Sequence, residues 1–436
     1  MNGFYLGWKN LTYKPLSLLL SLLLFALGTG LISLLLVLNH QLQEKFEKNL
    51  AGIDLVVGAK GSPLQLILSS MYHIDAPTGN VPIEEVKAFL RPGHPLIERA
   101  VPLSLGDSHQ GFRIVGTTHD FLDLYQAELA SGDLWSKDME VTIGATVADQ
   151  LKLKLGDQFS SSHGFVIDPN LVHDHPTQFN VVGILQPTGA VIDQLILTNT
   201  RSIWEVHEHA GAAVVEEAGE NHEDHDHEGD TGHDHSEEPI AVQPAAGEKP
   251  LYEETGQSIT SLLIQFKGRN IQTLNMQRSI NENTNQQAAT PAIEINRLYS
   301  NLGVGMDALR VLALVIVAVS AFSIFISLFS SLRERRYELA VMRVMGATPG
   351  KLLRLILTEG ILIAVIGCSL GLLLSHLSMN FLAQYMTDTY RYSFSGWTFL
   401  KAEAWLFLGA VGVGVLAAII PALQASRADI SDTLAE

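Results

Sequence analysis

An uninterrupted apolar segment near the start of the chain constrains the fold more than any other feature. The 23 positions of residues 16–38 carry no charge. As a helix that rises ~1.5 Å per residue they extend about 35 Å, enough to cross the ~30 Å hydrocarbon core of a bilayer. The hydrophobic content of 47% is also high for a soluble protein. The sequence therefore predicts a membrane-spanning helix here that stays attached as an uncleaved anchor.

Three further charge-poor segments occur late in the chain, so the sequence predicts four spans. They are residues 311–332, 360–377 and 404–426. Pairs of small residues four positions apart recur within the spans, and such pairs let helix backbones approach closely. The pairs are Ala26 and Gly30, Gly367 and Gly371, and Ala410 and Gly414. We expect them to pack helices together rather than to contact a transported substrate.

Basic residues near the ends of the spans predict the orientation, because lysine and arginine concentrate on the cytoplasmic side. Lys9 and Lys14 precede the first span, and only Arg391 and Lys401 separate the third from the fourth. The loop between the second and third spans carries six basic residues, namely Arg333, Arg335, Arg336, Arg343, Lys351 and Arg354. Both termini and this loop are therefore predicted to face the cytoplasm.

The predicted architecture is a four-helix membrane protein with a large α+β extracytoplasmic domain inserted between helices 1 and 2. Residues 1–38 form an interfacial helix and the first span, residues 39–308 the outer part, and residues 309–436 the other three spans with a cytoplasmic loop at 333–354. An apolar stripe of Leu42, Phe46, Leu50 and Ile53 predicts that the first helix continues outward as a stalk. Short β-like segments follow from Ile97 onward, and a helix over residues 272–301 returns to the second span.

One segment near the middle differs in composition from its surroundings. Residues 205–250 hold 14 acidic residues and one lysine; the remaining 27 basic and 32 acidic residues leave a net charge of −5 rather than −18. The acidity is therefore local, and it gives no reason to expect nucleic acid as a partner. Residues 205–255 contain too little apolar surface to offset the entropy of ordering, so we expect a disordered insert.

This insert concentrates histidine beside acidic side chains. Imidazole nitrogens bind zinc, nickel and copper, and carboxylates can complete the coordination shell. We expect zinc as a possible cofactor here. Its candidate ligands are His207, His209, His222, His225, His227, His233 and His235. Three interpretations stay open: metal capture or sensing tied to the role of the protein, metal binding incidental to that role, and a solvated acidic loop.

Four segments carry a resemblance to one family. The stretches RERRYELAVMRVMGATPGKLLRLILTEG at 333–360 and IPALQASRADISDTL at 420–434 resemble FtsX-like and MacB-like permeases of ABC transporters. The stretches LGWKNLTYKPL at 6–16 and ELASGDLWSKDMEVTIGATVADQLKLKLGDQF at 128–159 are similar to parts of MacB-like permeases. The resemblance covers the chain except for about residues 205–255.

The resemblance implies a role for the arginine-rich loop. In this family such a loop couples the permease to its ATPase, and the matching positions are Arg335, Arg336, Glu338, Arg343, Gly346 and Ala347. The residues agree, because a short amphipathic helix that presents Tyr337 among fixed charges can dock in a cleft of a partner. The alternative is that the arginines only set topology. Glu359, an acid at membrane depth, is assigned either to pairing with an arginine or to coupling.

The expected function follows from the resemblance. It implies a permease subunit of an ABC transporter in the bacterial cytoplasmic membrane, which works as a homodimer in membrane lipid with a separate ABC ATPase and performs efflux or mechanotransmission. The stretch GATPGKLL at 346–353 is not a phosphate loop, since it is one residue short and Leu352 replaces the serine or threonine. The histidine-rich insert favours a link to zinc or another transition metal, and a periplasmic partner stays open. The alternative function is a non-transporting membrane metal sensor. No motif of an enzyme is recognisable.

Overall fold

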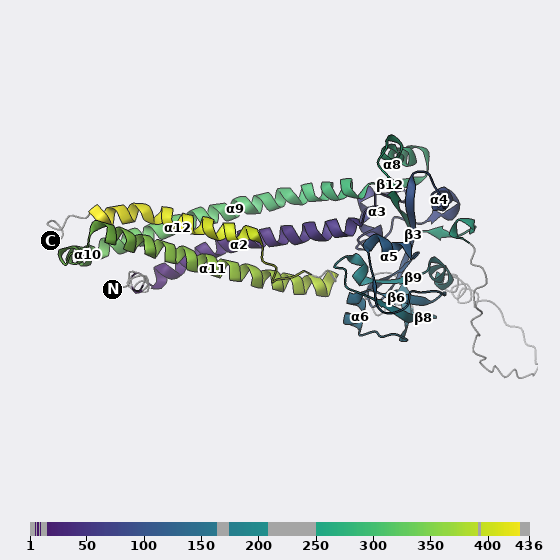
Figure 1. Ribbon diagram of the computed structural model, residues 1–436, viewed down its shortest axis with the longest axis horizontal. Helices are drawn as coiled ribbons and strands as arrows, with labels where there is room; N and C mark the ends of the chain where they lie inside the picture. The colour runs from purple at the N-terminus through teal and green to yellow at the C-terminus, as the bar shows by residue number, and fades with distance from the viewer. Residues whose placement is uncertain are drawn as a thin grey trace, which may run out of the picture. The chain divides into compact units, whose positions relative to one another are not determined.

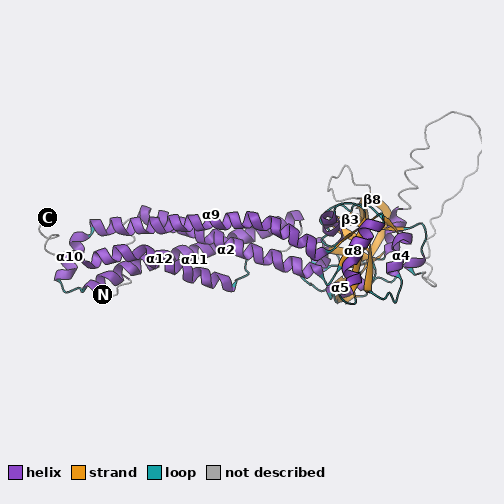
Figure 2. Cartoon of the chain, turned by 90° about the horizontal axis from the view of Figure 1, so that it is seen from above, coloured by secondary structure: helices purple, strands orange, loops and turns teal. Residues whose placement is uncertain are grey.

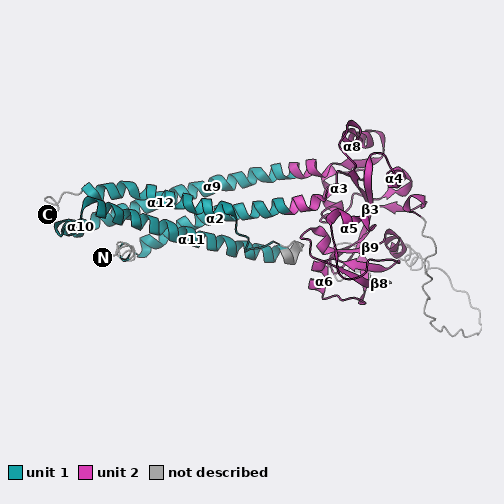
Figure 3. Cartoon of the chain, viewed as in Figure 1, with its two compact units in different colours: residues 1–44, 298–436 teal, residues 45–297 magenta. Residues whose placement is uncertain are grey.

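The computed structural model describes residues 5, 7, 9, 15–163, 174–207, 250–390 and 394–427 (Figure 1). Long helices and β-strands occupy different parts of the chain (Figure 2). The chain divides into two compact units (Figure 3). Met1–Glu44 and Leu298–Glu436 form the helical unit, and Lys45–Arg297 form the sheet unit. Most of the predicted interfacial helix before the first span, and most of the insert at 205–255, lie outside the described residues.

Over its described residues from Pro15 onward, the helical unit contains four long helices and one short helix. They are α2 (Pro15–Leu50), α9 (Pro291–Glu334), α10 (Arg336–Val344), α11 (Pro349–Tyr390) and α12 (Lys401–Arg427), with the distal ends of α2 and α9 belonging to the sheet unit. Within the described residues, the four long helices have the length and apolar composition needed to cross a membrane. The run of α2 to Leu50 confirms the predicted continuation beyond residue 38. Ala51 and Gly52 then end the helix with positive φ angles of 46° and 71°.

Small residues bring the long helices together, which confirms the packing role predicted for them. A Cβ atom on Gly30 of α2 would lie 2.8 Å from the carbonyl oxygen of Gly371 on α11, and one on Gly367 would lie 3.0 Å from the ring of Phe25. Gly414 of α12 packs equally closely against α11. Two serine contacts join α2 to α9, from Ser17 to Ser327 and from Ser21 to Ser323.

The sheet unit is centred on one large mixed sheet. Its strands lie in the order β12-β1-β11-β3-β4-β9-β6-β8-β5, and β7 pairs with both β3 and β8. Most pairs are antiparallel, but β4 pairs with β9 and β6 with β8 in parallel. The bounds are β1 (Leu55–Ala59), β3 (Ile97–His109), β4 (Phe112–Gly116), β5 (Leu129–Gly132), β6 (Glu140–Ile143), β7 (Gln158–His163), β8 (Asp174–Leu185), β9 (Leu195–Thr198), β11 (Ser261–Phe266) and β12 (Gln286–Ala289). A separate two-stranded sheet pairs β2 (Val81–Pro82) with β10 (Ser258–Ile259).

Short helices pack against this sheet and complete the predicted α+β arrangement. They are α3 (Pro63–Ser70), α4 (Ile83–Leu90), α5 (Asp120–Tyr125), α6 (Ala145–Leu151) and α8 (Ile271–Asn283), together with the 3₁₀ turns η1 (Val191–Gln194) and η2 (Leu251–Glu253). Two apolar clusters form the core. One contains Leu55, Leu262 and Ile264, and the other contains Phe112 and Phe179.

The prediction of one helix over residues 272–301 is wrong. Helix α8 ends at Asn283, strand β12 follows, and α9 begins at Pro291. Thr284 takes an extended conformation and ends α8, and β12 then pairs with β1 at the sheet edge, where Val56 faces Ala289. The tertiary pairing of a short polar strand therefore overrides its local helical preference.

The loop before η1 is hydrogen-bonded to the end of α2 that belongs to the sheet unit. The side-chain oxygen of Asn49 accepts a hydrogen bond of 2.8 Å from the backbone N–H of Val191, and Lys45 Nζ donates one of 3.0 Å to the carbonyl oxygen of Gly189. The Asp193 carboxylate stabilises the loop by accepting hydrogen bonds from the backbone of Thr188 and Gly189. The last turns of α2 are thus fixed to the sheet unit by polar contacts as well as by the chain.

Candidate functional site

The predicted coupling residues lie on and beside α10. This helix packs through Leu339 onto Leu352 and Ile356 of α11 and onto Ala422 and Ala425 of α12. A short helix alone is marginal in water, so this apolar seat is what holds α10 in place. These contacts fix the position of α10 on α11 and α12 and determine which of its side chains are exposed.

The opposite face of α10 is exposed and carries both charge and apolar surface. Arg336 and Glu338 are exposed, and Tyr337 is 64% exposed. Val344, seven positions after Tyr337 and therefore on the same side of the helix, is also 64% exposed. Arg335 at the N-cap and Arg343 in the last turn are half-buried. The structure thus places the predicted residues 335–338 and Arg343 on or next to one short helix, where Arg336, Tyr337 and Glu338 are exposed.

Gly346 and Ala347 have a structural reason to follow α10. Gly346 has a φ angle of +94°, a region that favours glycine. Its N–H donates to the carbonyl oxygen of Arg343, and the Ala347 N–H donates to that of Met342. This pair of bonds is a Schellman motif, which ends a helix sharply. Both residues therefore fix the end of α10 and the start of α11.

Glu359 does not belong to the exposed face of α10. It lies on α11, is 2% exposed, and packs beside Gly7, where an added Cβ would lie 3.5 Å from Glu359 Cγ. A buried carboxylate at this depth contacts the segment that precedes α2. Glu359 is therefore not part of the exposed surface of α10, and both roles predicted for it, pairing with an arginine and coupling, stay predictions.

Of the seven predicted metal ligands, only His207 lies within the described residues. It lies in a helix that is described over residues 200–207, and its Nε2 atom is 3.9 Å from Oδ1 of Asp107. The other six, His209, His222, His225, His227, His233 and His235, lie outside the described part. Within that described part, no three histidine, cysteine or acidic side chains are grouped closely enough to hold a metal ion.

His73, in the loop that follows α3, and Arg113 of β4 lie side by side and buried in the sheet unit. Arg113 of β4 donates hydrogen bonds to the carbonyl oxygens of His73 and Asp75. Burial lowers the pKa of His73 from 6.5 to about 3, with a further contribution from the Arg113 charge. Burial also lowers the pKa of Arg113, to about 9. Among the described residues, neither buried ring nitrogen of His73 has a hydrogen-bond partner, so its neutral form is the one the fold accommodates.

Sequence reasoning missed a buried polar cluster in the helical unit. His376 of α11 and Glu403 of α12 are 3% and 5% exposed, and His376 Nε2 lies 3.2 Å from Glu403 Oε1. Ser33 of α2 donates a hydrogen bond of 2.7 Å to the same oxygen. Helices α2, α11 and α12 thus meet at one carboxylate, although α2 is distant in sequence from the other two. The available signal was the single histidine within the apolar stretch GLLLSHLSM, because an ionisable residue inside a span is a candidate functional residue.

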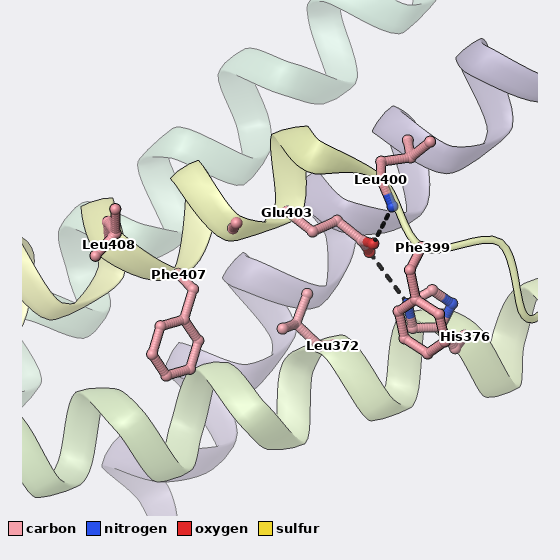
Figure 4. Close-up of a pocket in the computed structure, with 8 residues that line it drawn as sticks. Leu372, His376, Phe399, Leu400, Glu403, Phe407 and Leu408 are labelled. Atoms are coloured by element: carbon pink, nitrogen blue, oxygen red, sulfur yellow. Dashed lines mark hydrogen bonds and ion pairs between the residues drawn. The ribbon is translucent and has the colours of Figure 1, made fainter.

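A cavity of about 520 Å³ lies beside this pair (Figure 4). His376 and Glu403 lie at one end, and Leu372, Phe407 and Leu408 continue along α11 and α12 (Figure 4). Phe399 covers the imidazole, with ring centroids 4.4 Å apart. The cavity therefore joins one polar pair to an otherwise apolar wall.

Comparison with known families decides the identity of the chain. The FtsX-like permease C-terminal domain matches residues 310–430, and the MacB-like periplasmic core domain matches residues 18–227. The chain belongs to the FtsX-like and MacB-like permeases of ABC transporters. In this permease, α10, Glu359, His376 and Glu403 all lie within the FtsX-like match, whereas His233 and His235 lie outside both matches.

Curated relatives of this permease support the same family. The macrolide export ATP-binding/permease protein MacB of Shewanella sp. (strain W3-18-1) is 23% identical over 344 residues, which cover 78% of this chain and 46% of the relative. MacB of Burkholderia thailandensis is 28% identical over 180 residues, 41% of this chain and 24% of the relative. The ABC transporter permease YtrF of Bacillus subtilis is 28% identical over 129 residues, 27% of this chain and 29% of the relative. The matches thus span less than half the length of each relative.

Among solved structures, the extracellular domain of the noncanonic ABC-type transporter YknZ from Gram-positive bacteria is similar to part of this permease. The match has a TM-score of 0.28 and 11% sequence identity, and it covers 55% of this chain and 99% of that chain.

Proposed function

We propose that this permease couples ATP hydrolysis by a separate ABC ATPase subunit to movement of its sheet unit, in efflux or mechanotransmission. The observation that carries the proposal is the docking face of α10. Tyr337 and Val344 expose apolar surface between Arg336 and Glu338, while Leu339 holds the helix on its seat. An exposed apolar stripe flanked by charge, on a short rigid helix, is what a cleft of a partner protein recognises.

A single aromatic side chain provides the test. Tyr337→Ala removes the centre of the docking face and leaves the buried seat intact. We expect at least tenfold weaker association with the ATPase subunit, since a central interface tyrosine contributes ~2 kcal/mol or more. Co-purification and permease-stimulated ATP hydrolysis in nanodiscs measure this loss.

Tyr385→Ala is the matched control, because Tyr385 is an equally accessible tyrosine, 56% exposed, near the other end of α11. It is expected to leave association unchanged. Equal association of the ATPase with wild type and Tyr337→Ala would reject the docking face. A kinase or regulator recovered in place of an ATPase would favour the alternative function, a membrane metal sensor.

The proposed topology places both termini and α10 in the cytoplasm and the sheet unit outside a bacterial cytoplasmic membrane. It counts four spans, with the outer part inserted between the first and second. The basic residues of the loop at 333–354 support this orientation. Two copies of the permease in membrane lipid would offer one α10 to each of two ATPase subunits. Labelling of a cysteine introduced at Tyr337 by a membrane-impermeant reagent from outside intact cells would contradict it.

The histidine-rich segment supports a further proposal, that this transport system responds to zinc or another transition metal. Seven histidines among adjacent acids within residues 207–238 supply suitable ligands. The test compares ATP hydrolysis by the reconstituted complex with and without zinc, for the full chain and for a deletion of residues 207–238. We expect the zinc response to disappear with the segment, and an unchanged response would reject it.

A further inference from the structure

His376 and Glu403 present two hydrogen-bond acceptors to the same cavity (Figure 4). His376 Nδ1 lies 2.8 Å from the carbonyl oxygen of Gly396. Because a carbonyl oxygen only accepts, Nδ1 carries the hydrogen of the neutral imidazole and Nε2 is left as an acceptor. Nε2 is buried, and among the described residues no group makes a hydrogen bond to it. It lies 3.2 Å from Glu403 Oε1, so neither atom supplies the hydrogen that the other would accept.

The carboxylate of Glu403 also has acceptor capacity that the chain leaves open. Its Oε1 accepts a hydrogen bond of 2.7 Å from the Ser33 hydroxyl, and its Oε2 accepts one of 2.9 Å from the Leu400 N–H. Both donors are uncharged, whereas a carboxylate offers about four acceptor positions. A buried carboxylate without a cationic partner is costly. A cationic donor that enters the cavity would therefore be held by Glu403 and His376 together.

The rest of the cavity is suited to a hydrocarbon chain. Its volume of about 520 Å³ lies within the ~300–1,000 Å³ range of small-molecule sites. Leu372, Phe407 and Leu408 line it beyond the polar pair. Leu408 is 60% exposed, and α11 and α12 have the length and apolar composition of membrane spans. In a bilayer the cavity therefore opens toward acyl chains, from which an amphiphile can enter.

Aromatic side chains mark the polar end of the cavity as the level of the membrane interface. Trp397 and Phe399 lie in the connection before α12, Trp405 lies near the start of α12, and all three are exposed. Exposed tryptophan concentrates where the hydrocarbon core meets the lipid headgroups. The two acceptors thus lie at the depth of the headgroups, and the apolar wall continues toward the hydrocarbon core.

A basic side chain lies on the same face of α12 as the cavity wall. Lys401 is exposed, and Ala404 and Leu408 follow it at three and seven positions, which places the three on one side of the helix. Ala404 and Leu408 both line the cavity. The order of groups along this face is therefore a cation, then the buried acceptors, then an apolar wall. A zwitterionic amphiphile with a phosphate, an ammonium group and a chain has the complementary order.

We propose that this cavity binds a membrane phospholipid with an ethanolamine headgroup. Its ammonium group donates hydrogen bonds to His376 Nε2 and Glu403 Oε1, its phosphate lies beside Lys401, and one acyl chain follows Leu372 and Phe407. A primary ammonium combines the charge and the N–H donors that the two acceptors need. A choline headgroup carries the same charge without an N–H. The lipid site goes beyond the proposed coupling function, and its tests need no ATPase.

A headgroup series tests the proposal in the wild-type chain. Native mass spectrometry of the full-length permease in detergent gives the apparent Kd of the first lipid bound per chain. The probes are dioleoyl phosphatidylethanolamine, its N,N-dimethyl analogue and dioleoyl phosphatidylcholine, which differ in their N–H donors. We expect the ethanolamine lipid to bind about tenfold more tightly than the choline lipid, as one charge-assisted hydrogen bond contributes. The dimethyl analogue should lie between them, and equal Kd values across the series would overturn the proposal.

Glu403→Gln tests which side chain holds the ammonium group. Glutamine keeps the size of the side chain and an oxygen that accepts from Leu400, but it removes the charge. We expect the preference for ethanolamine over choline to disappear. Glu359→Gln is the matched control, because Glu359 is a buried glutamate of the same unit that does not line the cavity. A preference that survives in Glu403→Gln, or is lost equally in Glu359→Gln, would overturn the assignment. The wild-type series decides the matter where Glu403→Gln fails to fold.

A bulky side chain tests whether the lipid occupies this cavity. Ala404 lines the cavity and is exposed, so phenylalanine at this position fills space that the acyl chain needs. Ala404→Phe should weaken the binding of the ethanolamine and choline lipids alike. Ala402→Phe places the same ring at an exposed position that does not line the cavity, and it should leave both Kd values unchanged. Unchanged binding in Ala404→Phe would show that the lipid binds elsewhere.

Lys401→Gln distinguishes a phospholipid from a simple amine. Decylamine carries a primary ammonium and a chain but no phosphate. Lys401→Gln should weaken phosphatidylethanolamine several-fold, since it removes the charge beside the phosphate, and should leave decylamine binding unchanged. If the variant binds phosphatidylethanolamine as tightly as wild type does, the phosphate makes no contact there and a phospholipid is rejected as the occupant.

Discussion

Gly360 of α11 and Gly414 of α12 face each other with no space between them. A Cβ added to either glycine would lie 2.9 Å from the carbonyl oxygen of the other. Each added Cβ would also meet the methyl group of an alanine on the opposite helix, Ala418 or Ala364, at 2.6 Å or less. The closest approach of these two helices therefore depends on both residues lacking a side chain.

Gly414→Ala should consequently weaken the α11–α12 pair although alanine is the better helix former. Overpacking costs ~1–3 kcal/mol, which exceeds the ~1 kcal/mol gained in helix propensity. Gly412→Ala on the same helix is the control, because nothing lies within 4 Å of its added Cβ. Thermal unfolding in nanodiscs should show a lower midpoint for Gly414→Ala only; equal midpoints would contradict the close contact.

Gly346→Ala should loosen the end of α10. Its φ angle of +94° costs an alanine ~1–2 kcal/mol. Hydrogen exchange over residues 336–347 should rise, and ATPase stimulation should fall with it. Gly350→Ala, at an exposed helical position in the first turn of α11, should leave both unchanged. If Gly346→Ala keeps normal exchange, the Schellman motif does not hold the helix.

Asn49→Ala should release the end of α2 from the loop at Val191. The side chain of Asn49 is 1% exposed, so its removal leaves a buried N–H without a partner at a cost of ~1–3 kcal/mol. Exchange at residues 188–193 should increase several-fold. Asn283→Ala, which removes an exposed hydrogen bond to Ser279, should change stability by no more than ~0.5 kcal/mol. Similar exchange and stability in the two variants would show that the hydrogen bond from Val191 to Asn49 does not hold the end of α2.

His73 should make the sheet unit sensitive to acid. Its pKa is about 3 when folded, against 6.5 ordinarily, so between these values the unfolded chain binds a proton that the folded chain does not. Stability is therefore full above pH 6.5, and the unfolding free energy falls by up to ~1.4 kcal/mol per pH unit as the pH drops toward 3. His73→Asn does not titrate and tolerates the positive φ of 53° at this position. Denaturant unfolding at several pH values should show a shallower dependence for the variant, and identical slopes would exclude His73 as a cause.

Hydropathy and periodicity predicted the parts of the fold that local composition determines. The helix predicted from the apolar segment at residues 16–38 and from the stripe through Phe46 is confirmed in α2. An apolar run of that length favours a helix that can span a membrane, and the helical period of the stripe favours a continuation of the same helix. The strand β12 was missed, since its polar sequence forms a strand only through pairing with β1. Composition alone could not distinguish that edge strand from helix.

The candidate sites divide in the same way. Residues 335–338, at the start of α10, form one short segment, so a sequence pattern could group them, although their coupling role stays a prediction. Ser33 and Glu403 are 370 positions apart in the sequence, and only the packing of α2 against α11 and α12 brings them into contact. The metal role of the histidines at 207–235 also stays a prediction.

The pairing of β1 with β12 has a mechanical meaning. Strand β1 follows α2 directly and β12 directly precedes α9, and the start of the first strand faces the end of the second, Val56 opposite Ala289. Both tethers therefore attach at the same end of one antiparallel pair, about 5 Å apart. A force that moves the two helices in the same direction acts on both strands together. A force that separates the helices breaks the hydrogen bonds between β1 and β12 one after another. The β1–β12 pair is therefore expected to withstand concerted motion of α2 and α9 better than motion that separates these two helices.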